Sequence, residues 1–295
     1  MKDIGPVEAS GSASTLNDAG RAVLATMAKN FERWIAVLAP PPRWRDLLPS
    51  VPAIGLGFVT LIIVALSMVY YDTAASDWAR SLPQWFRNIF EKITDFGLSG
   101  WFLFPSGFLL LALAALISPR LSRMSQGVLA ALAVRIGFIF LAIAVPGLFV
   151  TIIKRLIGRA RPYVGSHDDP FAYMPFAWRP EYASMPSGHA TTAVAAALAI
   201  GAIWPRTRPV MWVYAAAIVF SRVVVLAHHP SDVIAGALVG AAGANLLRRW
   251  FAARRLLFSA RDLAAFPGPG WRRIGVALQE ALSAPTPAER KIAGD

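Results

Sequence analysis

Apolar residues along this chain gather in long runs that are interrupted by polar clusters. A helix that crosses a bilayer needs about 17–25 mostly apolar residues. Six stretches approach or meet this length, of which the fourth is the shortest. They cover residues 51–71, 101–117, 127–153, 189–204, 209–227 and 231–247. The pattern therefore predicts an all-α, polytopic membrane protein built on a bundle of six transmembrane helices.

Composition supports this interpretation. Of the 295 residues, 56% are hydrophobic and 16% are charged, with a mean hydropathy of +0.51, whereas a soluble domain is about 45–50% apolar. The chain has no cysteine, which excludes disulfides and thiolate metal sites. Its net charge of +12 comes from basic residues that flank the apolar runs. We therefore expect the lipid bilayer and its anionic headgroups, and not nucleic acid, as partners.

Basic residues also set the expected orientation. Lys and Arg are concentrated before the first span, in the loops at 118–126 and 205–208, and after Leu247. The positive-inside rule places these segments, and so both termini, in the cytoplasm. The loop at 72–100 is charge-balanced and fits the opposite side. Residues 154–188 fall on that opposite side yet include five basic residues, which anion binding explains and topology does not.

Three parts are expected along the chain. They are a cytoplasmic N-terminal segment at 1–50, a membrane core at 51–247 and a cytoplasmic region at 248–295. The first apolar run begins too far into the chain to be a signal peptide, so we expect it to stay as a span. Residues 16–38 and 248–266 have the apolar and basic spacing of amphipathic helices on the cytoplasmic leaflet. The remaining C-terminal residues are expected to be a loose tail.

The first of three polar clusters follows the third span and reads KRLIGRARP at 154–162. The ammonium group of Lys154 and the guanidinium group of Arg161 can neutralise a phosphate together. The alternative is that both side chains only reach from the membrane edge toward water. That alternative is the better explanation for Arg155 and Arg159.

The second cluster, Pro186-Ser187-Gly188-His189, stands at the start of the Ala-rich fourth span. A helix N-terminus offers unpaired N–H groups and a positive dipole end to a phosphate. Gly188 would let the backbone approach the anion closely, Ser187 adds a hydroxyl, and His189 would project toward the same anion. The alternative is a simple Ser cap. PSG without a following histidine recurs at 105–107, where we assign no chemistry.

The third cluster reads SRVVVLAHHPSD at 221–232. Arg222 lies in apolar sequence and needs an anionic partner. A proline at the start of the sixth span places Asp232 in the first helical turn, where its carboxylate can reach back to His228. A hydrogen bond to one ring nitrogen would leave the other nitrogen as a nucleophile. The alternatives are that Asp232 only caps its helix and that the neighbouring His229 takes this part, although the spacing favours His228.

Taken together, K-x6-RP, PSGH and SR-x5-H-x3-D resemble the signature of the type 2 phosphatidic acid phosphatase superfamily, and every position of that signature is filled. The resemblance covers residues 50–247 and leaves both termini outside it. It implies a six-helix membrane core with a metal-independent phosphatase site on the outer face. No metal and no other cofactor is then expected.

The same resemblance implies roles for particular residues. His228 would form a phosphohistidine, Asp232 would orient it, and His189 would protonate the leaving oxygen and then activate water. The phosphoryl oxygens would be held by Lys154, Arg161, Ser187, the backbone N–H of Gly188, and Arg222. These roles agree with the chemistry of the residues themselves, because phosphoryl transfer depends mainly on positioning and charge stabilisation.

The expected activity is hydrolysis of a phosphomonoester or diphosphate of a membrane lipid at the periplasmic face of the inner membrane. Phosphatidylglycerophosphate, phosphatidic acid, undecaprenyl diphosphate and lipid A phosphate all fit this expectation, and the sequence does not choose among them. Phosphate transfer to a second lipid is an alternative use of the same site. A non-catalytic phospholipid-binding carrier is a more remote alternative, because it needs neither two histidines nor an orienting Asp. The oligomeric state stays open.

Overall fold

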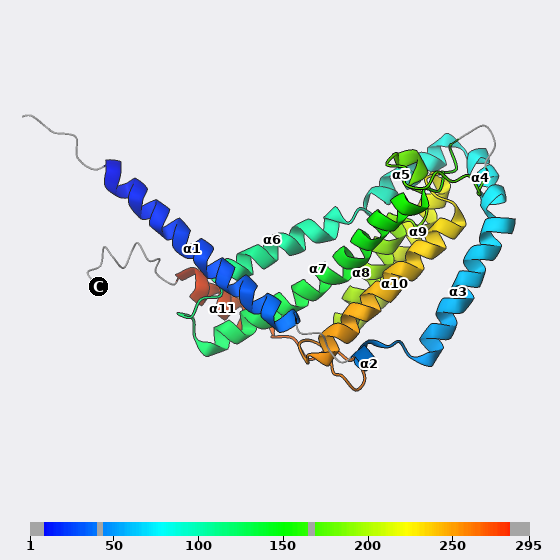
Figure 1. Cartoon of the computed structure of the whole chain (residues 1–295). Helices are drawn as coiled ribbons and strands as arrows, with labels where there is room; N and C mark the ends of the chain where they lie inside the picture. Colours follow the sequence, from blue (N-terminus) through cyan, green and yellow to red (C-terminus); the bar gives the residue numbers. More distant parts are fainter. Residues whose placement is uncertain (1–8, 40–43, 165–168, 284–295) are drawn as a thin grey trace, which may run out of the picture. The chain divides into compact units, whose positions relative to one another are not determined.

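The computed structural model describes residues 9–39, 44–164 and 169–283, and its regular structure in these ranges is helical (Figure 1). The helices are α1 Ala9–Leu38, α2 Trp44–Leu47, α3 Val51–Tyr70, α4 Asp72–Ser81, α5 Gln84–Asp95, α6 Gly100–Leu116, α7 Arg123–Ile157, α8 Gly188–Ile203, α9 Arg208–Val224, α10 Pro230–Ala253 and α11 Trp271–Ser283, with short 3-10 turns at Pro180–Tyr182 and Pro205–Thr207. Strand-like pairing within the described ranges is limited to two isolated bridges. The predicted all-α class is confirmed.

A helix occupies each of the six predicted spans, namely α3, α6, α7, α8, α9 and α10. Among the described residues, four helical stretches are long and apolar enough to cross a membrane: Val51–Tyr70, Gln84–Leu116, Arg123–Ile157 and Pro230–Ala253. The shorter helices α8 and α9 have 16 and 17 residues. The protein is therefore a multi-pass membrane protein, whereas the number of six spans stays a prediction.

The chain divides into two compact units. One comprises the described residues of Met1–Pro41, Phe108–Val134 and Pro267–Asp295, and the other comprises those of Pro42–Gly107 and Arg135–Phe266. The boundaries fall inside α6 and α7, so each of these helices contributes residues to both units. All the site residues predicted from the sequence belong to the second unit.

In the first unit, side chains of the flanking helices satisfy backbone groups at helix ends, where intrahelical partners are missing. The side-chain amide of Asn30 in α1 donates to the carbonyls of Ala114 (2.9 Å) and Ile117 (2.7 Å) at the end of α6. The carboxylate of Glu280 in α11 accepts the N–H of Ser122 (2.5 Å), just before α7. These contacts explain why both flanking helices pack on this unit.

The C-terminal region differs from its prediction. Residues 248–253 are the end of α10, and the chain then folds back over 257–266, so the amphipathic helix predicted over 248–266 is wrong. The fold-back buries Leu257 and Phe258 completely, and the Phe258 ring lies 4.8 Å from that of Phe138. Burial in a packed core is therefore preferred to exposure at a membrane surface. The expected loose tail is also wrong over Trp271–Ser283, which forms the amphipathic helix α11.

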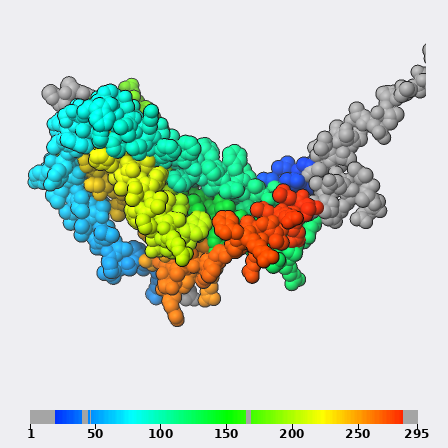
Figure 2. Space-filling view, turned by 180° about the vertical axis from the view of Figure 1, so that it is seen from behind, coloured from blue at the N-terminus to red at the C-terminus, as the bar shows by residue number. Residues whose placement is uncertain are grey.

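The core of the second unit lies between α8, α9 and α10, which run side by side in Figure 1. Small side chains dominate this core: Ala193, Val194, Ala197 and Ala215 pack together with Ile218. Small residues let helix backbones approach closely inside a membrane. Helix α9 also packs against α5, and Figure 2 shows its yellow-green surface beside the cyan surface of α4 and α5.

Two glycines set the distance between α8 and α10. A Cβ added at Gly236 would lie 2.4 Å from the carbonyl oxygen of Ser187, and one at Gly240 would lie 2.4 Å from that of Thr191. The Thr191 hydroxyl donates to the carbonyl of Gly236 (2.9 Å). The N–H of Ser187 in turn donates to the carbonyl of Asp232 (2.9 Å). The small-residue contact thus joins the second polar cluster to the third.

Candidate active site

The three polar clusters converge in the second unit. A cavity of about 360 Å³ opens among α7, α8 and the segment between α5 and α6. Lys154 at the end of α7 lines it together with Gly188 and His189 at the start of α8. The charges of Lys154, Arg161, Arg222 and His228 all act on His189. Residues separated by up to 74 positions in the sequence therefore share one site.

Two arginines at this site hold N–H donors that have no partner within the described part of the chain. Arg222 is 7% exposed and donates one N–H to the hydroxyl of Thr94 (2.5 Å). Its Nε, like the Nε of Arg161, is buried without a hydrogen-bond partner among the described residues. Buried N–H groups are normally paired. These two groups are therefore available to an anion that enters the site.

The start of α8 has the open geometry expected of an anion site. A Cβ added at Gly188 would meet nothing within 4 Å, so space remains beside this residue at the start of the helix. Ser187 is fully buried, and its hydroxyl accepts the N–H of Ala190 at 3.5 Å. The structure thus shows the capping contact that was the alternative for Ser187, at a length that leaves the cap weak.

His228 is held in a tight reversal between α9 and α10. The carbonyl of Arg222 accepts the N–H groups of both Ala227 (3.1 Å) and His228 (3.2 Å). Leu226 adopts a φ of 57°, a left-handed conformation that is uncommon for a residue other than glycine and that often occurs at functional sites. The His228 side chain is 4% exposed. Its position is therefore set by the backbone as well as by packing.

Asp232 faces His228, but the predicted direct hydrogen bond is not formed. The distance from Nδ1 of His228 to Oδ2 of Asp232 is 3.9 Å, which exceeds hydrogen-bond length. That oxygen already accepts the hydroxyl of Ser184 (2.5 Å) and the N–H of His229 (2.9 Å). The Ser184 hydroxyl also lies 3.5 Å from Nδ1 of His228. Ser184, which the sequence analysis did not single out, thus stands between the carboxylate and the imidazole.

The protonation of His228 follows from its surroundings. Burial lowers the pKa of His228 to about 4; Asp232 opposes the shift, while Arg222 and Arg161 add to it. The ring is therefore neutral at physiological pH. Because Nδ1 is directed toward Ser184 and Asp232, Nε2 is the nitrogen left for an incoming group.

His229 is placed differently from its neighbour. It is 1% exposed at the N-cap position of α10, and its Nδ1 lies 3.4 Å from the hydroxyl of Ser76 in α4. The structure therefore directs the two adjacent histidines to different partners. His228 is the one that lies beside Ser184 and under the influence of Arg222 and Arg161, and its catalytic role stays a prediction.

The position of Arg159 differs from the one predicted from the sequence. We expected its side chain to reach toward water, but it is 0% exposed. It donates to Oδ1 of Asp232 (2.5 Å), to the hydroxyl of Ser231 (2.7 Å) and to Oδ2 of Asp72 (2.7 Å). Asp72, assigned to a charge-balanced loop, is also 0% exposed. The sequence did hold one signal for Asp72: it is an ionisable residue directly after the apolar span 51–71, and such a position marks a functional candidate.

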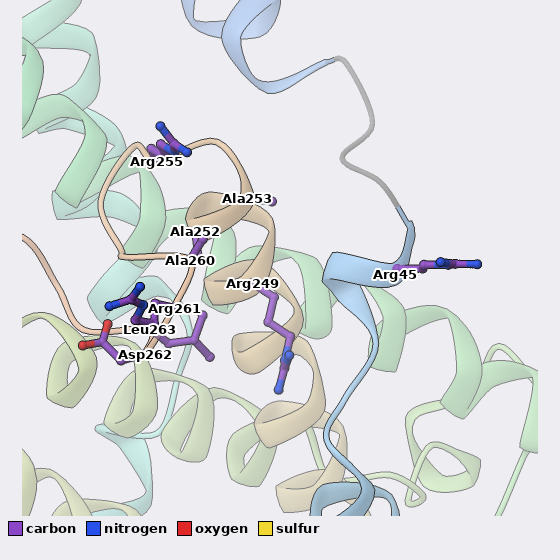
Figure 3. A pocket seen from close by; sticks show the side chains of 9 residues that line it. All are labelled: Arg45, Arg249, Ala252, Ala253, Arg255, Ala260, Arg261, Asp262 and Leu263. Atoms are coloured by element: carbon purple, nitrogen blue, oxygen red, sulfur yellow. The ribbon is translucent and has the colours of Figure 1, made fainter.

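A second cavity, of about 530 Å³, lies at the opposite end of α10. It is lined by Arg45, Arg249, Arg255, Arg261 and Asp262, among others. Figure 3 shows their guanidinium groups pointing in different directions, so they do not converge on one ligand position. Since α10 has 24 residues, this cavity is separated from Asp232 by most of a helix about 36 Å long. Among the described residues, no group of three or more His, Cys, Asp or Glu is arranged to hold a metal ion.

Comparisons with known proteins identify the family of this chain. The sequence profile of the PAP2 superfamily matches residues 135–256. A lipid A 1-phosphatase of Rhizobium johnstonii is 35% identical over 240 residues, which cover 81% of this chain and 93% of the relative. A lipid A 1-phosphatase of Rhizobium etli is 34% identical over 203 residues, which cover 68% of this chain and 82% of the relative.

Among solved structures, a transmembrane PAP2-type phosphatidylglycerolphosphate phosphatase from Bacillus subtilis is similar with a TM-score of 0.47 and 19% identity. The match covers 66% of this chain and 94% of that one.

Proposed function

This chain belongs to the PAP2 superfamily and is a membrane lipid phosphatase, and on that premise we propose that its substrate is the 1-phosphate of lipid A. The observation that carries the substrate is the long match to two relatives, at 35% and 34% identity, that are both lipid A 1-phosphatases. We place the reaction at the periplasmic face of the inner membrane, with both chain termini in the cytoplasm. The basic segments before α3, at 118–126 and 205–208, and after Leu247 support this orientation, and anion binding explains the basic content of 154–188.

In the proposed reaction, Nε2 of His228 attacks phosphorus and the bond from phosphorus to the sugar oxygen breaks. His189 donates a proton to the leaving oxygen. Asp232 stabilises the ring of His228, which is cationic while phosphorylated. His189 then removes a proton from water, the water oxygen attacks phosphorus, and cleavage of the phosphorus–nitrogen bond releases phosphate and regenerates His228. The direction of Nδ1 toward Asp232 and the place of His189 on the cavity wall support these roles.

The proposed phosphate site needs donors that do not have to rearrange. Phosphoryl oxygens would accept hydrogen bonds from Lys154, Arg161, Arg222, Ser187 and the N–H of Gly188. Donors held in place before the reaction stabilise transition-state charge effectively in a site that excludes water. The unpaired Nε groups of Arg161 and Arg222 and the open space at Gly188 support this assignment.

The substrate proposal is tested by phosphate release from purified protein in mild detergent with EDTA. The lipids compared are lipid A, phosphatidylglycerophosphate, phosphatidic acid and undecaprenyl diphosphate, with His228→Ala as the control. We expect fastest release from lipid A and none from the variant. Preferential release from one of the other lipids would replace lipid A as the substrate. Label from a donor lipid that appears on an acceptor lipid, without free phosphate, would replace hydrolysis with transfer.

The orientation is tested with single cysteines, because the natural chain has none. Trp178, in the loop before α8, is 81% exposed, and Trp271, at the start of α11, is 89% exposed. In intact spheroplasts we expect Trp178→Cys to react with a membrane-impermeant maleimide and Trp271→Cys to react only after lysis. The reverse pattern would invert the proposed topology.

A further inference from the structure

We propose that Asp72 and Arg159 are a positioning pair that sets the negative charge which Asp232 presents to His228. This inference rests on the proposed function, because it assumes that His228 becomes cationic during the reaction. Neither residue belongs to the set that the sequence analysis predicted. Arg159 donates to Oδ1 of Asp232, whereas Oδ2 is the oxygen 3.9 Å from Nδ1 of His228, and neither Asp72 nor Arg159 lines the cavity.

Arg159 joins the two carboxylates directly. One of its terminal nitrogens donates to Oδ1 of Asp232 (2.5 Å) and the other donates to Oδ2 of Asp72 (2.7 Å). All three side chains are 0% exposed. Its Nε donates to the carbonyl of Pro170 (2.9 Å), so the guanidinium group is fixed by three different segments of the chain. Charges in such a dry setting act strongly on one another.

The balance of charge in this cluster is uneven. One guanidinium group faces two carboxylates, which leaves one negative charge in excess. Without Asp72, Arg159 would pair with Asp232 alone and would cancel most of the field that Asp232 exerts on the imidazole. With Asp72 present, the guanidinium charge is shared. Asp232 therefore keeps an uncompensated negative charge for the moment when the His228 ring becomes cationic.

Asp72 is itself held in place by hydroxyl and backbone groups. Its Oδ1 accepts the N–H of Ser231 (3.0 Å) and the hydroxyl of Ser67 (3.2 Å), and its Oδ2 accepts the hydroxyl of Ser231 (2.5 Å). Ser231 directly precedes Asp232 in the first turn of α10 and also accepts from Arg159. The pair is thus coupled to Asp232 through the backbone as well as through the guanidinium group.

A purely structural role is the competing explanation, because a buried ion pair that loses one partner leaves an uncompensated charge. A double variant that restores the net charge of the cluster distinguishes the two explanations. Asp72→Asn removes the excess negative charge, whereas Asp72→Asn combined with Arg159→Gln restores it with a neutral pair of amides. A charge-setting role predicts that the double variant is faster than Asp72→Asn. A structural role predicts that it is no faster.

The experiment measures kcat and KM for the wild type, Asp72→Asn, Arg159→Gln and the double variant, on the lipid that the wild type cleaves fastest. Asp77→Asn is the matched control, because Asp77 lies on the same helix with a side chain 69% exposed. We expect Asp72→Asn to lower kcat by about 10- to 100-fold with little change in KM. The double variant should recover about tenfold of this loss, and Asp77→Asn should match the wild type.

The inference would be overturned if Asp72→Asn kept the wild-type kcat. It would also be overturned if the double variant recovered no activity while its vanadate binding and thermal unfolding stayed normal. If any variant fails to fold, Asp72→Glu decides, because it keeps the charge: activity closer to the wild type than to Asp72→Asn supports the pair. Since all rates are ratios to the wild type on its best lipid, a wrong lipid refutes only the substrate proposal. Retained activity in His228→Ala would refute the proposed mechanism independently.

Discussion

Several arginines surround each end of α10, but the two groups differ in how deeply some of them are buried and in whether they converge. Near its N-terminus, Arg159 is completely buried and reaches two carboxylates, and Arg222 is 7% exposed with one donor left open. Near its C-terminus, Arg249 and Arg261 line a larger cavity, but their side chains point apart (Figure 3). Positive charge alone therefore does not locate a site. Burial combined with convergence is what distinguishes the candidate site.

The physical reason lies in the cost of desolvation. Taking a charged group out of water costs several kcal/mol unless partners compensate for the loss. Arg255 and Arg261, near the C-terminal end of α10, avoid that cost by staying exposed to solvent, where positive charge also suits a membrane surface. Around His228 the charged side chains are buried in spite of this cost, and an ionisable group kept at membrane depth usually serves a function. Four predictions test this contrast.

The largest effect is expected from Asp232→Asn. The amide cannot stabilise a cationic His228 ring, so kcat should fall by about 10⁴-fold with KM nearly unchanged. Steady-state kinetics on the preferred lipid measures both constants. Asp262→Asn, at the cavity of the opposite end, should behave like the wild type. An equal loss in both variants would remove the distinction between the two ends.

Paired arginine variants give the next largest effect. Arg222→Gln removes a buried donor and should lower kcat/KM by about 10²- to 10³-fold. Arg249→Gln, near the other end of the same helix, should stay within about twofold of the wild type. The measurement is phosphate release for both variants at matched detergent and lipid concentration. If Arg249→Gln lowered kcat/KM as much as Arg222→Gln does, the cavity at the C-terminal end of α10 would also be needed for activity.

A smaller effect is expected from Gly97→Ala. The added Cβ would lie 2.9 Å from Cδ2 of His189 and 2.6 Å from Cγ2 of Ile218, so the imidazole must shift. We expect about a tenfold loss in kcat, because small displacements of catalytic groups are costly. Gly147→Ala is the control: Gly147 lines the same cavity, but a Cβ there meets nothing within 4 Å. Equal activities of the two variants would show that the close approach at His189 is unimportant.

The smallest effect concerns pH. The neutral imidazole attacks, so protonation of His228 abolishes the reaction as pH falls. Because the pKa of His228 is lowered to about 4 from an ordinary 6.5, the acid limb that His228 imposes on kcat/KM should lie near pH 4. In Asp232→Asn, where the carboxylate that opposes this shift is gone, the limb should move to still lower pH. A His228 limb near pH 6.5 would mean that the ring is more solvated than its burial indicates.

Prediction from sequence succeeded best for the helical class and for the family. The helical class, the membrane and the lipid phosphatase family are confirmed, because long apolar runs and three spaced motifs are local signals. The roles of Lys154, Arg161, Arg222, His189 and His228 stay predictions, although the structure brings these residues together. The direct hydrogen bond that His228 was expected to donate to Asp232 is not formed, because the facing carboxylate oxygen already accepts the Ser184 hydroxyl and the N–H of His229.

The sequence by itself determined which segments are apolar, where they end, and which reactive side chains stand at those ends. Only the tertiary structure decided that Arg159 points inward and not toward water, and that Asp72 is its partner across 87 positions of the chain. The physical reason is that apolar length and motif spacing are properties of neighbouring residues. Whether a charged side chain is buried or exposed depends instead on which distant residue packs beside it, and a local sequence pattern does not contain that information.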